Sequence, residues 1–165
     1  MDEDLRAELL ARSEEDQRVR RAAGERRLTQ DELQEMRRID QANTTWLTEL
    51  TDRVGWPGRT LVGEDGADAA WLLAQHAAKE RQSAFLELLR AAVTAGEASA
   101  TNLAYLEDRV RVFAGQPQLY GTQFRRDDQG LRPGPIEDPE HLGQRRASVG
   151  LGPFAEYEAQ MRRRS

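Results

Sequence analysis

Of the two histidines in this chain, His76 is the one whose position suits acid–base chemistry. It follows Gln75 in a segment with helical periodicity, one turn after Leu72 and three residues after Leu73, so its ring is expected on the core side of a helix. An imidazole in that position is either a packed core residue with both ring nitrogens hydrogen bonded, or a general base or acid. The sequence alone leaves both interpretations open.

A second set of polar residues lies between residues 102 and 123. Asp108 and Arg109 occur in a segment striped with apolar residues, and the motif Gln118-Leu119-Tyr120-Gly121-Thr122-Gln123 follows it. In the functional interpretation, the aspartate orients the histidine ring while a phenol, amides and a guanidinium hold a substrate. We therefore predict three catalytic residues, which are His76, Asp108 and Tyr120. The predicted substrate-binding residues are Gln75, Arg109, Gln118, Thr122 and Gln123.

The same motif also has a structural interpretation. Tyr120 and Gln123 could close a long loop onto the domain by hydrogen bonding to backbone groups, and Asp108 and Arg109 could form ordinary surface ion pairs. Gly121 is expected where the backbone needs a positive φ or a close approach. The structural interpretation would leave the motif without a direct part in any chemistry.

The residue pattern gives little support to metal or cofactor chemistry. His76 and Glu80 share a helical face, but the second histidine, His141, falls just after a helix start in a turn that is expected to be exposed. The sequence contains no glycine-rich phosphate loop, nucleophile elbow or HExxH pattern. We therefore predict neither a metal nor a cofactor.

The composition restricts the classes of function. The chain has 165 residues, no cysteine and a formal net charge of −5. This acidic balance disfavours nucleic acids and anionic membranes as partners, and the lack of cysteine removes disulfides and thiolate sites. No apolar run approaches the roughly 20 residues that span a bilayer. The start of the chain, Met1-Asp2-Glu3-Asp4, is acidic and unlike a secretory signal, so we expect a soluble protein of the bacterial cytoplasm.

Hydrophobic periodicity predicts an all-α fold, an irregular bundle of about six helices. The expected helices cover residues 2–27, 30–54, 66–79, 84–93 and 100–114, with shorter ones after residues 138 and 152. Thr29 and Glu32 form a capping box at the start of the second helix. Residues 60–63 are expected to be a short extended connection.

One loop and one terminal segment complete the expected organisation. Residues 115–137 lack periodicity and predict one long polar loop across an end of the bundle, of the kind that is functional or disordered. Residues 1–28 predict a charged, loosely packed N-terminal helix, because its strong apolar residues are few, and residues 29–165 predict a single helical domain. On the second helix, Asp40 and Asn43 lie one turn apart and either share a pocket or face solvent.

An ordered set of short motifs resembles a family of small bacterial proteins of unknown function. The set includes Gly55-Trp56-Pro57, Val62-Gly63, Gln75-His76, Asp108-Arg109, Tyr120-Gly121-Thr122-Gln123 and Pro135-Ile136-Glu137-Asp138-Pro139. The resemblance covers roughly residues 36–163 and leaves the N-terminal helix outside. Because the family carries no assigned activity, the resemblance implies candidate positions and no chemistry. Family members often have an aspartate where this chain has Ala78, which disfavours a mechanism that needs a carboxylate there.

Two hypotheses of different classes follow. The first is a small-molecule binding protein, and in its more specific form a cofactor-independent acid–base enzyme that uses a His/Asp/Tyr/Gln site. The second is a protein-interaction or regulatory module, in which the charged outer helices dock to a partner and the Tyr-Gly-Thr-Gln motif is structural. The oligomeric state and the identity of a ligand are not readable from the sequence.

Overall fold

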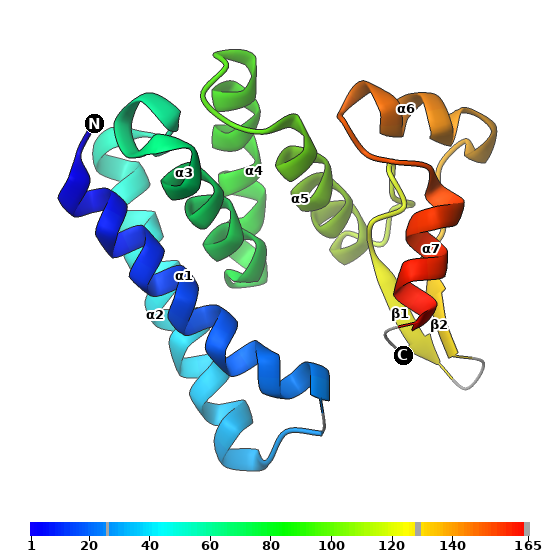
Figure 1. Ribbon diagram of the computed structural model, residues 1–165, viewed down its shortest axis with the longest axis horizontal. Coiled ribbons are helices and arrows are strands. Elements are labelled where there is room, and N and C mark those ends of the chain that lie inside the picture. Colours follow the sequence, from blue (N-terminus) through cyan, green and yellow to red (C-terminus); the bar gives the residue numbers. More distant parts are fainter. Residues whose placement is uncertain (26, 128–129, 164–165) are drawn as a thin grey trace. The chain divides into compact units, whose positions relative to one another are not determined.

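A computed structural model describes residues 1–25, 27–127 and 130–163 of the chain, and for residues 22–25 and 127 it describes the backbone alone. The described part is 72% helical, with seven α-helices and one small two-stranded sheet. This composition confirms the prediction of an irregular all-α fold. The chain divides into two compact units, residues 1–99 and residues 100–165, and Figure 1 shows the elements of each.

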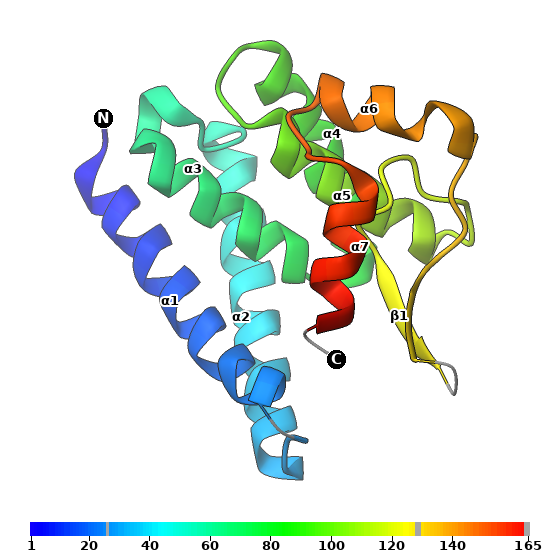
Figure 2. The same ribbon diagram turned by 45° about the vertical axis from the view of Figure 1, so that its right-hand side comes forward.

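The first unit consists of four helices, α1 (Glu3–Glu25), α2 (Gln30–Val54), α3 (Arg59–His76) and α4 (Lys79–Thr94). Helix α1 lies along both α2 and α3 (Figures 1 and 2), and α4 packs against α3. Large apolar side chains from all four helices are buried and form the core of this unit, among them Leu9, Leu47, Leu50, Leu73, Phe85 and Leu89. Burial of this apolar surface is the main force that holds the four helices together.

The N-terminal helix is an integral part of the first unit. Leu9 and Asp16 are both buried on the side of α1 that faces its neighbours. The first compact unit runs from Met1 to Ser99 and so includes this helix. Beyond Leu9 the stripe that faces the neighbouring helices is polar, with Asp16 buried and Arg12 and Arg20 partly buried, and a count of apolar residues misses it.

Local signals in the sequence explain where α2 begins and where α3 bends. Thr29 accepts a hydrogen bond from the backbone N–H of Glu32, whose carboxylate in turn accepts one from the Thr29 backbone, which confirms the predicted capping box. The expected extended connection at residues 60–63 is wrong, because α3 already begins at Arg59. Gly63 has a φ of 74° and allows the chain to bend there and continue as a helix.

The second unit contains α5 (Ala100–Phe113), a β-hairpin of β1 (Phe124–Asp127) and β2 (Gly130–Pro133), the short helix η1 (Pro139–His141), α6 (Leu142–Ser148) and α7 (Phe154–Arg163). The hairpin corrects the prediction that residues 115–137 form one long irregular loop. Its strands are antiparallel, with Phe124 opposite Pro133 and Arg126 opposite Leu131. Residues 128–129, which belong to the predicted loop, lie outside the described residues.

Among the described residues, no helix is both long enough and apolar enough to cross a lipid bilayer.

Candidate functional site

His76 is the last residue of α3, and its ring is held by a carboxylate from the N-terminal helix. The Nδ1 atom of His76 lies 2.8 Å from Oδ2 of Asp16, and Asp16 is only 1% exposed while the His76 side chain is 17% exposed. Because an ionised carboxylate can only accept, this contact assigns the ring proton to Nδ1. The neutral ring then has its lone pair on Nε2, and that nitrogen can accept a proton.

Asp16 therefore holds the ring nitrogen for which the sequence suggested Asp108. A carboxylate on one nitrogen fixes the tautomer and orientation of an imidazole, and it stabilises the imidazolium that forms when the other nitrogen takes up a proton. The second histidine provides a comparison. His141 Nδ1 also lies 2.8 Å from a carboxylate, that of Asp138, but these two side chains are 59% and 52% exposed. Solvent competes for the exposed pair, whereas the buried Asp16 has few alternative partners.

Two further charged groups extend the contact of His76 with Asp16. Arg20, one turn further along α1, places Nη1 3.2 Å from Asp16 and donates a hydrogen bond of 2.8 Å from Nη2 to Asp40 on α2. One guanidinium thus bridges two carboxylates. Burial raises the pKa of Asp40, and the neighbouring Arg20 partly offsets this effect. We call the four residues His76, Asp16, Arg20 and Asp40 the histidine cluster.

Asn43 supplies a separate contact between α1 and α2. It is buried and accepts a hydrogen bond of 3.2 Å from Arg12, whose guanidinium also lies 4.5 Å from the centre of the Trp46 ring. Arg12 and Asn43 both line a surface cavity of about 290 Å³. Asp40 and Asn43 therefore both face α1, and only Asn43 borders the cavity.

The backbone that carries His76 is fixed from both sides. Gln82 is buried on α4 and donates hydrogen bonds to the carbonyls of Gln75 and Ala77, at 3.1 and 3.0 Å. Thr44 accepts a hydrogen bond of 3.0 Å from the backbone of Ala78. The predicted substrate-binding residue Gln75 is itself buried and lies next to His76 on α3. These contacts fix the backbone at the junction between α3 and α4, from which the His76 side chain extends.

In the second unit, Asp108 organises the motif at residues 118–123. Its fully buried carboxylate accepts hydrogen bonds from the backbone N–H groups of Leu119 at 2.6 Å, Tyr120 at 3.0 Å and Thr122 at 2.9 Å, and from the Thr122 hydroxyl at 2.9 Å. The aspartate therefore has the role of a cap for the loop that follows its own helix. Tyr120 contributes its backbone N–H to these contacts and not its phenol.

Gln118, near the start of the same loop, also binds backbone groups of the loop through its side chain. Its buried amide donates to the carbonyls of Gln123 and Gly134 at 3.1 and 3.0 Å, and accepts from the Gln123 backbone at 2.8 Å. The loop is thereby joined to the segment that follows β2. Gln123 donates to the hydroxyl of Thr122 through its side chain at 3.0 Å.

Two arginines of α6 also bind the backbone of this loop. Arg145 donates a hydrogen bond of 2.9 Å to the carbonyl of Leu119, and Arg146 donates one of 2.6 Å to the carbonyl of Tyr120. Gly121 has a φ of 68°, and a β-carbon added to it would lie 2.7 Å from the ring of Phe154. Both expectations for this glycine, a positive φ and a close approach, are confirmed.

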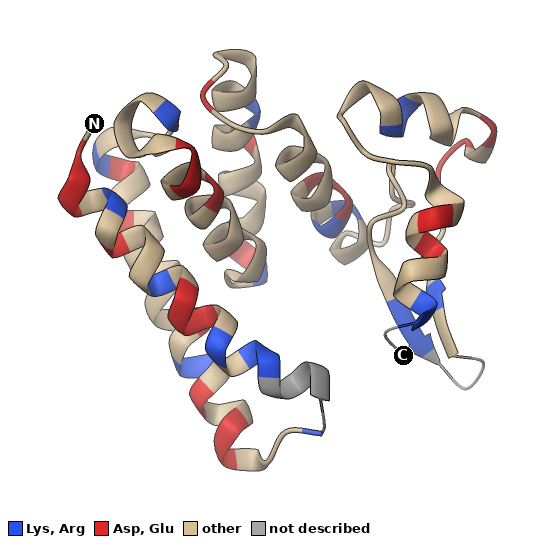
Figure 3. Cartoon of the chain, viewed as in Figure 1, with Lys and Arg blue, Asp and Glu red and all other residues tan. Residues whose placement is uncertain are grey.

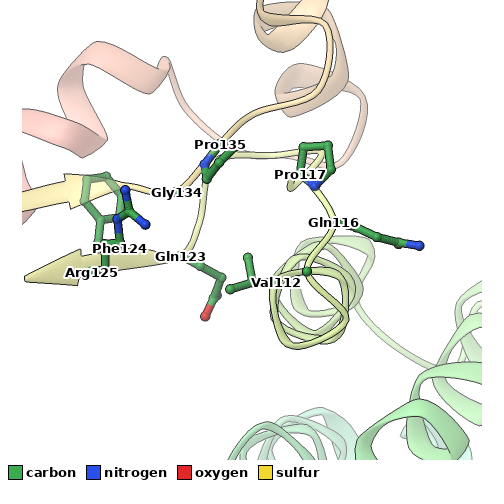
Figure 4. A pocket seen from close by; sticks show the side chains of 9 residues that line it. Val112, Gln116, Pro117, Gln123, Phe124, Arg125, Gly134 and Pro135 are labelled. Atoms are coloured by element: carbon green, nitrogen blue, oxygen red, sulfur yellow. The ribbon is translucent and has the colours of Figure 1, made fainter.

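A largely apolar cavity of about 300 Å³ borders the motif. Gln123 and Phe124 form one side of it and Val112 of α5 forms another, as Figure 4 shows. The pocket is completed by the turn after α5 and by the residues after β2, including Pro117 and Pro135. Among the predicted substrate-binding residues of this unit, Gln123 is the one that lines this cavity.

The predicted site residues thus fall into two groups. Asp108, Tyr120, Gln118, Thr122 and Gln123 come together around the motif, with Arg109 half-buried next to Asp108 on α5. Gln75 and His76 belong to the other group, in the first unit. The sequence reasoning missed Asp16 and Arg20 at the histidine, and Arg145 and Arg146 at the motif.

The chain matches the model of a family of unknown function, DUF6624, over residues 3–163. The chain belongs to this family. The DUF6624 match confirms the resemblance to an uncharacterised family and extends it, because it includes α1 as well as the range 36–163. Searches of curated proteins and of solved structures found no match. Among the described residues of this DUF6624 protein, no three His, Cys, Asp or Glu side chains are grouped so that they could hold a metal ion.

Proposed function

We propose that this DUF6624 protein is a small-molecule binding protein that acts as a cofactor-independent acid–base enzyme, with His76 as the group that transfers the proton. The observation that carries the proposal is the 2.8 Å contact between His76 Nδ1 and the buried carboxylate of Asp16. The proposal places this protein in the bacterial cytoplasm, as expected from the sequence.

The proposed proton transfer uses the two ring nitrogens differently. Nε2 of His76 removes a proton from the bound molecule, and the imidazolium that results is stabilised by Asp16 at Nδ1. The proton then returns from Nε2 to another atom of the substrate or to the leaving group. Arg20 acts as a positioning residue, because its contact with Asp16 fixes the carboxylate against the ring.

In this proposal the motif at residues 118–123 has a structural role within its own unit. Asp108, Gln118 and Thr122 fix the loop through hydrogen bonds of their own unit, which supports the structural interpretation of these three residues. Asp16 replaces Asp108 as the residue that orients the ring. The substrate-binding roles of Gln75, Arg109 and Gln123, and a catalytic role for the Tyr120 phenol, stay predictions.

Hydrogen exchange in heavy water tests the proposal without a known substrate. The protein is incubated in D₂O with a panel of small carbonyl compounds, and proton NMR follows the replacement of C–H hydrogens by deuterium. We expect exchange of at least one compound, with a loss of roughly 100- to 10,000-fold in the His76→Gln protein, as is typical for removal of a general base. The Asp16→Asn protein should lose a large part of the rate as well.

The exposed histidine pair supplies the matched control. His141→Gln removes an imidazole that has the same 2.8 Å contact with a carboxylate, and it should leave the exchange rate unchanged. Equal exchange in the wild-type and His76→Gln proteins would contradict the catalytic proposal. A thermal-shift screen of the same panel would then show whether the protein binds one of these compounds without chemistry.

The second candidate is a protein-interaction module. One observation favours it, namely that the motif residues Asp108 and Gln118 are occupied by structural hydrogen bonds. In this case the docking surface lies on the charged outer helices, and acidic and basic residues occur together along α1 and α2 (Figure 3). Capture of a partner that depends on exposed charges of α1 and is indifferent to Gln123→Ala would favour this candidate over the enzyme.

A further inference from the structure

Arg146 of α6 carries a positive charge that is almost completely buried in the second unit. Its side chain is 2% exposed, with Nε donating to the carbonyl of Gly152 at 2.7 Å and Nη1 donating to the carbonyl of Tyr120 at 2.6 Å. The guanidinium also lies 5.7 Å from the centre of the Phe154 ring and 5.2 Å from that of Tyr157. Carbonyl groups and aromatic faces stabilise a cation, but neither neutralises its charge.

The hydrogen-bonding capacity of this guanidinium is only partly used. An arginine has five N–H groups, and the two bonds to Gly152 and Tyr120 leave three of them without a protein acceptor in the described part of the chain. Among the described residues, Arg146 has no carboxylate within ion-pair distance. The negative charge of Asp108 stabilises the Arg146 cation from a longer distance, although the Asp108 carboxylate forms its hydrogen bonds with the loop. Burial lowers the pKa of Arg146, and Tyr105, Tyr157 and Asp108 offset this effect in part.

Arg146 forms part of the wall of a cavity of about 400 Å³ in the second unit. Other polar residues around this cavity include Tyr105, Tyr157 and Gln160, and a second arginine, Arg163, lines it from α7. A cavity of this volume accommodates a small molecule or one polar group of a larger one. Glu156 is also part of the lining; it and Arg163 are both exposed, so water partly screens their opposite charges.

We propose that this cavity binds the oxyanion group of a small molecule, a phosphate or a carboxylate. The unused N–H groups of Arg146 donate to its oxygens, and Arg163 adds a second positive charge. A planar guanidinium is suited to two parallel hydrogen bonds with either group, and such charge-assisted bonds are stronger than neutral ones. Glu156 lowers the affinity for an anion by repulsion. The proposal is independent of the proton transfer assigned to His76.

Isothermal titration calorimetry at low ionic strength tests the site with two probes, inorganic phosphate and acetate. We expect saturable binding of at least one of them in the millimolar range or tighter, and the stronger probe identifies the class of oxyanion. Arg163→Gln should weaken that binding by up to about fivefold, because an exposed charge contributes little to binding in water. Glu156→Gln, which removes the repulsive charge, should strengthen it.

Arg162→Gln is the matched control, because Arg162 is the sequence neighbour of Arg163, does not line the cavity and pairs with Glu158. It makes the same change in net charge and should leave the binding constant nearly unchanged. If Arg162→Gln and Arg163→Gln weaken the binding equally, the anion responds to the net charge of the protein and not to this cavity, and the proposal is overturned. Failure of both probes to bind the folded wild-type protein would overturn it as well. Because these variants lie on the exposed face of α7, folding is not at risk as it would be in a variant of Arg146.

Discussion

Replacement of Asp108 by alanine should destabilise the second unit strongly. The carboxylate is fully buried and accepts hydrogen bonds from three backbone N–H groups and one hydroxyl. Alanine leaves these donors without an acceptor, and each buried donor that loses its partner costs about 1–3 kcal/mol. Because water will reach some of them after the loop relaxes, we expect a total loss of about 3–5 kcal/mol, the range found when a buried charged partner is removed. For a chain of this size, the loss corresponds to a fall in Tm of roughly 6–20 °C.

Thermal and urea denaturation followed by circular dichroism measure this loss. Glu140→Ala serves as the control, since Glu140 is an exposed acid of the same unit and its removal should change stability by less than about 0.5 kcal/mol. Asp108→Asn keeps the size of the side chain but presents one carbonyl oxygen to several donors, so its stability should lie between those of alanine and wild type. An Asp108→Ala protein that melts within about 2 °C of wild type would refute the assignment of Asp108 as the cap of the loop.

Two further predictions concern the backbone and the pH dependence. Gly121→Ala should destabilise the protein by about 2–4 kcal/mol, from a positive φ and from overlap with Phe154. Gly143→Ala, whose added β-carbon meets open space, should be neutral or stabilising, and equal melting temperatures of the two variants would contradict this explanation. Burial raises the pKa of Asp40 in the folded protein above the pKa of the same carboxyl in the unfolded chain. The folded protein therefore binds this proton more readily, and the carboxyl contributes less stability as the pH rises through its pKa. The free energy of unfolding of the Asp40→Asn protein, minus that of wild type, should therefore increase from acid to neutral pH. If urea titrations give a difference that does not change with pH, burial does not raise the pKa of Asp40.

The sequence was sufficient for features that depend on neighbouring residues. The capping box of Thr29 and Glu32 and the positive φ of Gly121 are local rules, and both are confirmed. Helical periodicity predicted the all-α class for the same reason. The hairpin was missed because β1 is Phe-Arg-Arg-Asp, which shows no strong alternation of apolar residues. Its strand position depends instead on tertiary contacts, such as the stacking of Phe124 on Phe154 with ring centres 6.4 Å apart.

The carboxylate at His76 was missed for a physical reason. Asp16 is 60 residues away in the chain, and no local pattern connects the two positions. One signal was nevertheless present, because Leu5 and Leu9 begin a stripe that continues at helical spacing through Arg12, Asp16 and Arg20. Polar residues that extend an apolar stripe are candidates for buried hydrogen-bonding groups. A count of apolar residues alone therefore misses the buried carboxylate of Asp16 on α1.

Nitrogen NMR of isotope-labelled protein determines directly which nitrogen of the His76 ring carries the proton. At a pH where the ring is neutral, a proton-transfer site built on Asp16 requires the proton on Nδ1 and a free lone pair on Nε2. Asp16→Asn should reduce this preference, while His141→Gln should leave the His76 signals unchanged and assign them. A neutral His76 with its proton on Nε2 in the wild-type protein would contradict the proposed role of Asp16 and, with it, the proposed function of His76 as a base.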